Sequence, residues 1–401
     1  MKNETLLLFF RLSIKVDCID FLVERVGKEI MAVQQTASTQ SRLARKNRKR
    51  SVGMRFFLYT IFSFVLLSIL SLCWFFLTAS GTTVRLMMAD TLITTQHRDW
   101  AKYLIGSEEL QKRVEAYWKK FDEMGDEKDK GIVQIEPVSS TAPTAAVKKE
   151  LVTIEPISGT NFKGQLVTIS DPKKLRIAVP DKVGKGEKVS SMVKRTGAIL
   201  GVNGGGFIDP NWEGNGFQPE GIVMSGGKIF YNDKGMNGTV QVVGIDKEGR
   251  MIAGKYKVSE LVAMGVQEAV SFSPRFIVNG VGQIKSQADG WGIAPRTSMA
   301  QTKDGSILFA VIDGRQTHSI GATLYDIQEI FLAHGAVTAA NLDGGASTVL
   351  VHNNAIINKP SSEYGERYLP TAWLVFEHPE TAPIKNVWEG LDIRKIDPSK
   401  W

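Results

Sequence analysis

Residues 323–347 read TLYDIQEIFLAHGAVTAANLDGGAS, which places a helical pattern, a strand-like run and a glycine turn in succession. Thr323 suits the N-cap of a helix, and Asp326 follows three residues later in the spacing of a capping box. The apolar residues after this cap lie on one helical face: Leu324, Ile327 and Phe331. Gly335 suits the end of the helix. The stretch therefore predicts a helix that is followed directly by a buried strand.

Three strand-like runs in the chain end in the same way. Each buried-type run ends on an amide or a carboxylate that glycine follows: 198–202 before Asn203-Gly204-Gly205, 307–312 before Asp313-Gly314, and 337–340 before Asn341-Leu342-Asp343-Gly344-Gly345. A carboxylate at the end of a buried strand is costly unless it is paired or faces a cleft, and glycine lets the backbone approach a ligand. Any one of these ends alone is an ordinary turn. The three together favour a polar site.

Around these runs, residues 151–378 alternate between short apolar strands and turn signals. The turns are Ser225-Gly226-Gly227, Lys247-Glu248-Gly249, Lys303-Asp304-Gly305 and Asn353-Asn354. At least three helices interrupt the strands. Hairpins mixed with helices predict an α+β domain with mixed or antiparallel sheets and packed helices. Residues 379–401 contain three prolines and predict a surface extension.

The N-terminal part contains one long apolar run. Phe56–Thr78 has 23 residues and no charge, which is the length of a bilayer span. A buried core helix and a signal peptide cleaved after 79–81 are the alternatives, but a cleaved signal has a shorter apolar core. We therefore expect a single-pass membrane anchor over 56–78. Seven basic residues precede it, and the positive-inside bias places 1–55 in the cytoplasm and the rest outside.

Charge and cysteine content exclude other classes. The chain has 401 residues and a net charge of +7, and residues 1–55 hold all of this excess, so the remainder is neutral. A nucleic-acid-binding domain would be basic, so we expect no nucleic-acid partner, and the basic segment beside the anchor favours contact with anionic lipid. The two cysteines, Cys18 and Cys73, both lie before residue 79. The C-terminal part therefore folds without disulfides.

Residues 79–150 predict an extracytoplasmic stalk and linker. Apolar residues within 82–121 recur at helical spacing: Leu110, Val114, Tyr117 and Phe121. Residues 122–150 have a charged run and then Pro, Ser and Thr, which is linker composition. We therefore place a domain boundary near residue 150 and expect 151–378 to fold without the stalk.

Charged residues near the strand ends are the candidates for chemistry. The carboxylates are Asp313, Asp343 and Glu220, and the arginines are Arg275, Arg296 and Arg315. Guanidinium groups bind phosphate oxygens bidentately. The sequence has no P-loop, no GxSxG elbow and no zinc-ligand spacing. His318 could border a site near Arg315.

The motifs resemble those of the phosphodiester glycosidase family over roughly residues 150–378. The resemblance rests on Asn203-Gly204-Gly205-Gly206-Phe207, Ala294-Pro295-Arg296-Thr297, Asp313-Gly314-Arg315 and Asn341-Leu342-Asp343-Gly344-Gly345-Ala346-Ser347. The chain differs from the family pattern at Gly206, at Ala346 and at Ser298-Met299, and none of these differences removes a charged candidate.

The resemblance implies hydrolysis of the glycosidic C1–O bond of a sugar-1-phosphodiester, in cell-wall or exopolysaccharide metabolism. Two carboxylates flanking the bond are the usual glycosidase solution, so Asp313, Asp343 and Glu220 are the catalytic candidates with their roles open. Arg296, with Arg275 or Arg315, would hold the phosphate. The other substrate-binding candidates are Asn203, Gly204, Gly205, Asn341 and Ser347.

The sequence leaves cofactors and other functions open. A divalent cation beside carboxylates and phosphate is compatible with this chemistry, although no metal motif is present. The expected partner is a glycan or a sugar-phosphate polymer. The alternatives are a non-catalytic polysaccharide-binding module and a phosphodiesterase that cuts the P–O bond.

Overall fold

The computed structural model describes residues 4–93, 95, 97–134 and 149–400, and side chains are described from residue 24 onward except 40–41 and 43–53. The chain forms two compact units, Met1–Thr82 and Thr83–Trp401. Residues 135–148 of the linker expected over 122–150 lie outside the described residues.

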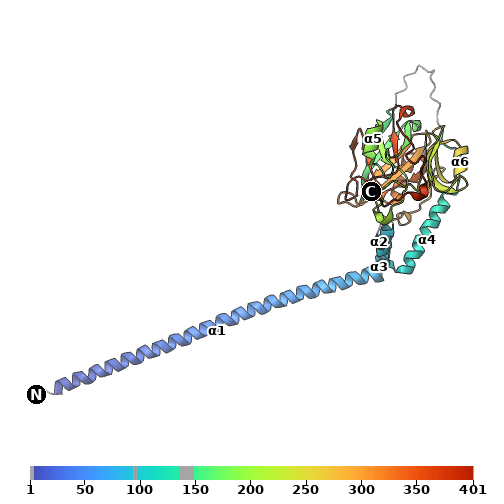
Figure 1. Cartoon of the computed structure of the whole chain (residues 1–401). Coiled ribbons are helices and arrows are strands. Elements are labelled where there is room, and N and C mark those ends of the chain that lie inside the picture. The colour runs from blue at the N-terminus through green and yellow to red at the C-terminus, as the bar shows by residue number, and fades with distance from the viewer. Residues whose placement is uncertain (1–3, 94, 96, 135–148, 401) are drawn as a thin grey trace. The chain divides into compact units, whose positions relative to one another are not determined.

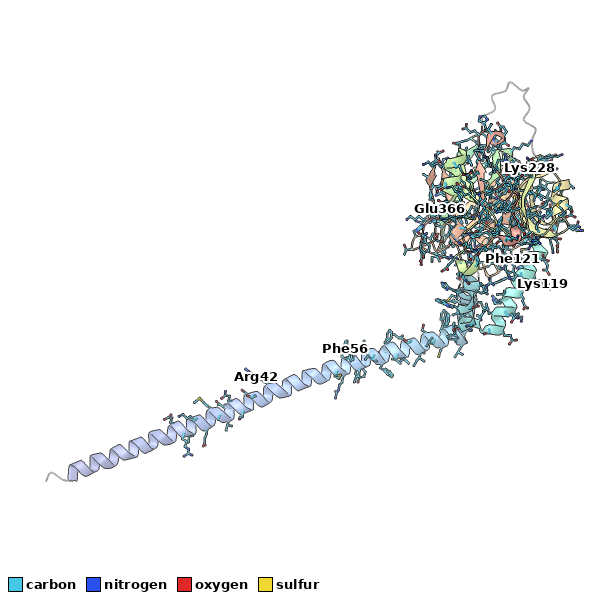
Figure 2. All side chains as sticks on the ribbon, in the orientation of Figure 1. Arg42, Phe56, Lys119, Phe121, Lys228 and Glu366 are labelled. Atoms are coloured by element: carbon cyan, nitrogen blue, oxygen red, sulfur yellow. The ribbon has the colours of Figure 1, made fainter. Side chains whose placement is uncertain are left out.

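The first unit consists mainly of helix α1 (Glu4–Leu77). Within it, Met54–Leu77 has a mean hydropathy of 2.3, and none of it is buried inside the structure. The side chain of Phe56 projects from the helix and is 74% exposed (Figure 2). By length and composition this apolar helix can cross a membrane, and a signal sequence has the same properties.

The second unit contains three antiparallel sheets, which confirms the α+β class (Figure 1). Sheet I has the order β1 (Val152–Ser158), β2 (Lys163–Ile169), β13 (Ile307–Ile312), β12 (Arg296–Thr302), β14 (Ala336–Asn341), β10 (Arg275–Val278) and β11 (Val281–Gly282). Sheet II has the order β16 (Ala355–Ile356), β15 (Leu350–His352), β4 (Leu200–Asn203), β17 (Ala372–Val375) and β3 (Leu175–Ala178). Sheet III has the order β6 (Lys228–Asn232), β5 (Ile222–Ser225), β9 (Val266–Ser271), β7 (Thr239–Asp246) and β8 (Met251–Lys257).

Among the residues of the second unit that the structure describes, six α-helices accompany these sheets. They are α2 (Ala79–Ile93), which begins just before the unit boundary, α3 (Lys102–Ile105), α4 (Ser107–Met124), α5 (Val189–Thr196), α6 (Val258–Ala263) and α7 (Leu324–Ala333). Short 3-10 helices are η1 (Arg98–Ala101), η2 (Pro172–Lys174), η3 (Pro210–Trp212), η4 (Gln287–Asp289), η5 (Gly345–Ser347), η6 (Pro379–Thr381) and η7 (Ile393–Lys395). The predicted capping box of α7 is present, since Thr323 Oγ1 accepts from Asp326 N at 3.2 Å and Thr323 N donates to the Asp326 carboxylate at 2.8 Å.

The main hydrophobic core lies where the three sheets meet. Its buried residues come from every sheet: Val167 and Phe309 from sheet I, Val202 and Trp373 from sheet II, and Val243 and Val270 from sheet III. Separate apolar clusters join α7 to sheet I, α5 to sheet II and α6 to sheet III. Burial of apolar surface between these layers is the main term that stabilises the fold.

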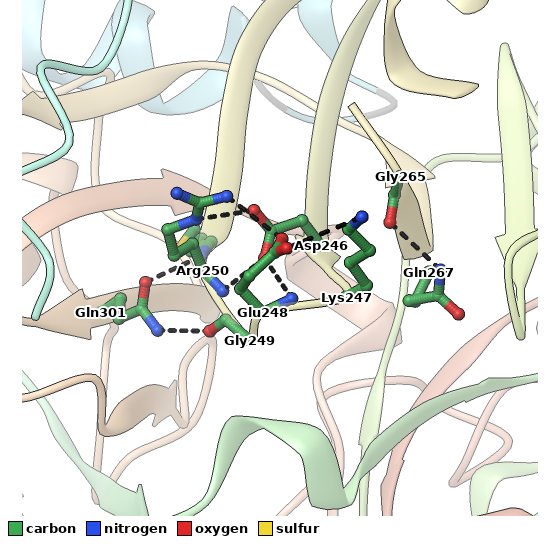
Figure 3. Close-up of polar contacts among 9 residues, drawn as sticks. Asp246, Lys247, Glu248, Gly249, Arg250, Gly265, Gln267 and Gln301 are labelled. Atoms are coloured by element: carbon green, nitrogen blue, oxygen red, sulfur yellow. Dashed lines mark hydrogen bonds and ion pairs between the residues drawn. The ribbon is translucent and has the colours of Figure 1, made fainter. Parts of the chain in front are cut away.

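The expected hairpin turns are present, and one of them also joins two sheets. The turn between β7 and β8 contains Lys247-Glu248-Gly249, and Asp246 accepts there from Arg250 Nε at 2.8 Å (Figure 3). Buried Gln301, from β12 of sheet I, donates to Gly249 O at 2.8 Å and accepts from Met251 N at 2.7 Å. The β7–β8 turn is therefore hydrogen-bonded to β12, a strand about fifty residues later in the chain.

Helices α2 and α4 belong to the second unit, whereas the sequence placed a stalk there. Phe121 packs edge-on against buried Trp291, with 4.6 Å between the ring centroids. After α4, Arg275 Nη1 donates to Glu127 O at 2.6 Å and Arg275 pairs with Asp129. The C-terminal end of the apolar face recognised in the sequence, Tyr117 and Phe121, therefore packs against the sheet domain. Leu110 and Val114 pack instead in a separate cluster that includes Ala89 and Ile93 of α2.

The C-terminal segment also packs into the core, although it was expected to be a surface extension. Trp388 is buried between Phe217 and Tyr231, and its Nε1 donates to Phe217 O at 3.1 Å. Asn215 N donates to Pro398 O at 2.8 Å. A single buried tryptophan stabilises by up to several kcal/mol, which explains why this proline-containing tail is ordered against the domain.

Candidate functional site

The candidate site begins at one edge of sheet I. Strands β13 and β14 both pair antiparallel with β12, so they run in the same direction and end at the same edge. Asp313 follows β13 there, and Asn341 ends β14. Arg296 begins β12 between them, in register with Ile312. Two of the three predicted strand ends thus lie at one edge, as the sequence suggested.

The third strand end comes from sheet II and is joined to this edge by Asn203. Its Nδ2 donates to Asp343 O, while its Oδ1 accepts from Thr297 Oγ1 at 2.9 Å and from Val349 N at 3.1 Å. Asn203 is fully buried. These bonds use the amide to fix the backbone of Asp343, so Asn203 acts as a positioning residue.

The glycines after Asn203 allow a close approach of two strands. Gly204 N donates to Thr371 O at 3.1 Å, and Gly205 N donates to Thr371 Oγ1 at 3.0 Å. A Cβ at Gly204 would lie 2.4 Å from Thr371 Oγ1, which no side chain tolerates. Both N–H groups are hydrogen-bonded within the protein, so they are not available to a ligand. The two glycines therefore form part of the wall of the site.

Asp343 is the most perturbed carboxylate of the candidates. Its Oδ2 is buried and has no hydrogen-bond partner among the residues that the structure describes. Burial raises the pKa of Asp343 to about 7; Ser347, within hydrogen-bonding range, opposes the shift, and the charge of nearby Glu220 reinforces it. Orphaned buried carboxylate oxygens are costly, and such groups are frequent at active sites.

Glu220 is the second carboxylate at this place. Loss of solvation raises its pKa, and the charge of Asp233 raises it further. Its backbone N donates to Gly206 O at 3.0 Å, and a Cβ at Gly206 would lie 3.0 Å from Glu220 Oε2. The glycine that departs from the family pattern therefore leaves room for the Glu220 side chain.

The structure adds residues that the sequence did not single out. Arg367 Nη2 pairs with Asp209 Oδ2 at 2.9 Å, and its guanidinium lies 5.0 Å from the centroid of the Phe207 ring. The charges of Arg367 and Asp209 act on Asp343 in opposite directions. Asp209 and Arg367 lie in irregular polar loops with no strand or glycine signal, so nothing in the sequence pattern distinguished them.

The arginines have different surroundings. Arg296 is buried and donates to the carbonyls of Ala322, Trp291 and Gly292 at 2.7–3.2 Å. Burial lowers its pKa to about 10, and the charge of nearby Arg315 contributes to this. Neither guanidinium forms an ion pair with a carboxylate among the described residues, and two like charges that act on each other favour a nearby anion.

Arg315 is the arginine best placed to receive that anion. Its backbone has a φ of 57°, uncommon for a residue other than glycine and frequent at functional sites. A Cβ at Gly345 would lie 3.5 Å from its Nη2, so the guanidinium borders the loop that carries Asp343. Among the described residues its guanidinium makes no hydrogen bond or ion pair. Arg275, in contrast, is 1% exposed and engaged by Asp129.

The remaining candidates have partners of their own. Asp313 Oδ1 accepts from Lys359 N at 2.9 Å and from Asn358 Nδ2 at 3.1 Å, and His318 Nε2 lies 3.0 Å from its Oδ2. Asn341 Oδ1 accepts from Ser298 Oγ at 3.0 Å. Asp313 thus faces His318 and a separate groove. Asp343 and Glu220 both bond to the 204–206 turn, since Asp343 N donates to Gly204 O at 3.2 Å and Glu220 N donates to Gly206 O at 3.0 Å.

Metal ligation finds no support in this arrangement. Within the described ranges, no group of three or more His, Cys, Asp or Glu side chains is placed to hold a metal ion. The divalent cation allowed by the sequence stays a prediction.

The α+β domain thus brings two carboxylates with raised pKa values, Asp343 and Glu220, to the 204–206 turn. The family model of phosphodiester glycosidases matches residues 196–376. This match confirms the resemblance seen in the motifs.

Curated relatives match only part of the chain. The SPbeta prophage-derived uncharacterized protein YomE of Bacillus subtilis is 26% identical over 202 residues, 49% of this chain and 30% of that protein. The N-acetylglucosamine-1-phosphodiester alpha-N-acetylglucosaminidase of Bos taurus is 35% identical over 69 residues, 17% of this chain and 13% of that protein. The chain thus spans less than a third of the length of either relative.

Solved structures also match part of the chain. The zebrafish N-acetylglucosamine-1-phosphodiester alpha-N-acetylglucosaminidase catalytic domain, auto-inhibited by its pro-peptide, has a TM-score of 0.47 and 20% identity over 63% of this chain and 94% of that one. A hypothetical protein from Synechocystis has a TM-score of 0.40 and 15% identity over 56% and 62% of the two chains.

Proposed function

We propose that this chain hydrolyses the glycosidic C1–O bond of sugar-1-phosphodiesters, and that Asp343 and Glu220 are the two carboxylates at the reacting carbon. The observation that carries the proposal is the buried, unpartnered Oδ2 of Asp343, whose pKa is about 7. A carboxyl group poised near neutral pH suits proton transfer or attack at an oxocarbenium-like centre. The family of residues 196–376 and the names of its relatives support the substrate class.

The leaving group fits the charges beside Asp343. A phosphate monoester is a good leaving group, so the site needs little general acid strength but must stabilise growing negative charge. Arg315 borders Gly345, and Arg296 lies close to it. We assign phosphate contact to Arg315 and a positioning role to Arg296, whose guanidinium is occupied by backbone carbonyls. Asp313 falls outside this pair because its oxygens are held by Lys359, Asn358 and His318.

The test is hydrolysis of an aryl or UDP sugar-1-phosphodiester in water enriched in heavy oxygen. The expected result is turnover with the label in the released sugar, which reports C–O cleavage. Label in the phosphate would instead identify a phosphodiesterase that cuts the P–O bond. Binding of the substrate without turnover would identify a non-catalytic binding module and overturn the proposal.

Substitution of Arg315 tests the phosphate contact. Arg315→Ala should raise KM by roughly tenfold to a hundredfold, since a hydrogen bond to a charged group contributes about 1.5–3 kcal/mol. Arg315→Lys should restore the affinity in part, because an ammonium cannot reproduce the bidentate fork. Steady-state kinetics on the same substrate measure both variants. An unchanged KM in Arg315→Ala would show that the phosphate of the substrate does not bind at this loop.

We further propose that Met54–Leu77 anchors the chain in the cell membrane with the N-terminus in the cytoplasm, and that the enzyme acts in the cell envelope on wall or exopolysaccharide polymers. The apolar length of this helix supports the anchor, and the basic residues before it support the orientation.

Topology is measured with reporters fused after Trp401. A reporter active only outside the cytoplasm should be active, and a reporter that requires the cytoplasm should be silent. The reverse pattern would refute the orientation. Release of a processed chain that begins after residue 78 would show a cleaved signal in place of an anchor.

A further inference from the structure

A second polar site lies beside the carboxylate pair. A groove of about 470 Å³ opens between the β1–β2 hairpin and the segment that follows β16. Two lysines, Lys163 and Lys359, lie among its lining residues and are exposed to solvent. The other polar side chains that line it are Ser158, Gln165, Asp313, His318 and Asn358.

The acidic side chain in this groove does not neutralise the two lysines. Asp313 is the one acidic side chain among the lining residues, and its Oδ1 and Oδ2 are taken up by Lys359 N, Asn358 and His318. The ammonium groups of Lys163 and Lys359 make no ion pair within the described part of the chain. Each lysine alone is an ordinary surface charge, but two of them in one recess with the side-chain amide of Gln165 form an anion-binding environment.

The groove shares a wall with the loop that carries Asp343. Asn358 Nδ2 donates to Thr348 O at 3.3 Å, and Ser361 Oγ donates to Gly345 O at 3.3 Å. Gln316, next to Arg315, donates through Nε2 to Lys359 O at 2.8 Å. The backbone of residues 358–361 therefore lies between the groove and the loop that carries Asp343. Arg315 also lies between the groove and this loop.

We propose that this groove is a subsite for a second anionic group of the substrate, so that the natural substrate is a phosphodiester-linked polymer with repeated charges. The subsite rests on the proposed function for its substrate class. With the reacting sugar at Asp343 and its phosphate at Arg315, the next phosphate along the chain reaches Lys163 and Lys359. The side-chain amide of Gln165, which also lines the groove, then donates to a linking oxygen.

The test compares binding by the full-length chain in detergent micelles. The probes are poly(glycerol phosphate), polygalacturonate as a carboxylate polymer, and inorganic phosphate. In the double variant Lys163→Gln/Lys359→Gln, the affinity for poly(glycerol phosphate) should fall roughly fivefold to tenfold and lose most of its salt dependence, since two exposed charge contacts are removed. The variant Lys163→Arg/Lys359→Arg should retain affinity.

A matched control removes two exposed lysines elsewhere. Lys194 is on α5, and Lys228, which is labelled in Figure 2, is on β6. Neither has an ion pair among the described residues. Lys194→Gln/Lys228→Gln should bind poly(glycerol phosphate) like the unmodified chain. An equal loss in this control, or no loss in the groove variant, would overturn the subsite. Equal affinity of the unmodified chain for polygalacturonate would overturn the phosphodiester class.

Kinetics separate this inference from the proposed function. The groove variant should raise KM several-fold for a polymeric substrate and leave KM unchanged for an aryl sugar-1-phosphodiester, which is too short to reach the groove. Equal rises for both substrates would contradict a separate subsite. If the chain hydrolyses neither substrate, the proposed function fails, and the binding comparison still decides whether the groove holds a polyanion.

Discussion

Asp343→Asn should lower turnover of a sugar-1-phosphodiester by about 10²–10⁴-fold, because a positioned carboxyl group that transfers protons contributes about that factor. The amide is nearly isosteric, and the bond from Asn203 goes to the backbone carbonyl of residue 343, so the substitution leaves the loop in place. The measurement is kcat on the folded variant. A near-normal kcat would remove Asp343 from the catalytic pair and leave Glu220 as the leading candidate.

The stability of the same variant provides an independent readout. Folding raises the pKa of Asp343 from 3.8 to about 7, so ionisation costs stability in the folded state. Stability contributed by the protonated form is present below the unfolded pKa and is lost as pH rises through about 7. Asp343→Asn should therefore raise Tm at pH 8 and change it little at pH 4. A carboxylate that only caps a turn would lower Tm on substitution at both values.

The pH profile assigns the role of Asp343. If its carboxyl group donates a proton, kcat should fall above about pH 7, and if the carboxylate is the nucleophile or base, kcat should fall below it. Glu220 also has a raised pKa, so its ionisation gives the second limb of the pH profile of kcat. Because the two groups are close, the limbs belong to the pair, and the one that disappears in Asp343→Asn identifies the contribution of that residue.

The sequence predicted the strand ends better than the side chains that act there. Buried runs before Asp313 and Asn341 correctly indicated strand ends at one edge of sheet I, because strands that flank a common antiparallel partner end together. Asn203 ends a strand of sheet II and reaches this edge through its side-chain hydrogen bonds. The sequence could not show which carboxylate oxygens lack a hydrogen-bond partner in the folded protein. Asp313 and Asp343 look alike in sequence, yet one is held by a backbone N–H and two side chains and the other has an orphaned oxygen. This difference depends on loops from 348 to 361 that carry no periodic signal.

Arginines were equally hard to separate. Arg275, Arg296 and Arg315 each follow or precede a glycine or proline motif, so the pattern treats them alike. Arg275 is neutralised by Asp129, nearly 150 residues away in the chain, and only tertiary structure brings these two together. Long-range pairing of this kind also explains why the domain boundary predicted near residue 150 differs from the start of the second unit at Thr83.

A chain that begins at residue 150 should fail to fold cooperatively, although residues 151–378 contain all the strand motifs. Such a chain lacks α4, and its loss exposes the ring of Trp291, which is 1% exposed in the intact unit. It also lacks Asp129 and leaves the buried Arg275 unpaired. Removing one partner of a buried ion pair costs about 3–5 kcal/mol, a large fraction of the ~5–15 kcal/mol that stabilises a typical domain.

The matched control is a chain that begins at Ala79, the first residue of α2, and keeps α2, α4 and Asp129 while omitting α1. Thermal unfolding followed by circular dichroism should show one cooperative transition for this chain, whereas the chain from residue 150 should aggregate or show no transition. Both lack the apolar helix, so its absence cannot cause the difference. Equal Tm values would show that residues 79–134 are a stalk after all. A chain from Ala79 that carries Asp129→Ala should fall between the two, because it loses the partner of Arg275 but retains the packing of Phe121 on Trp291.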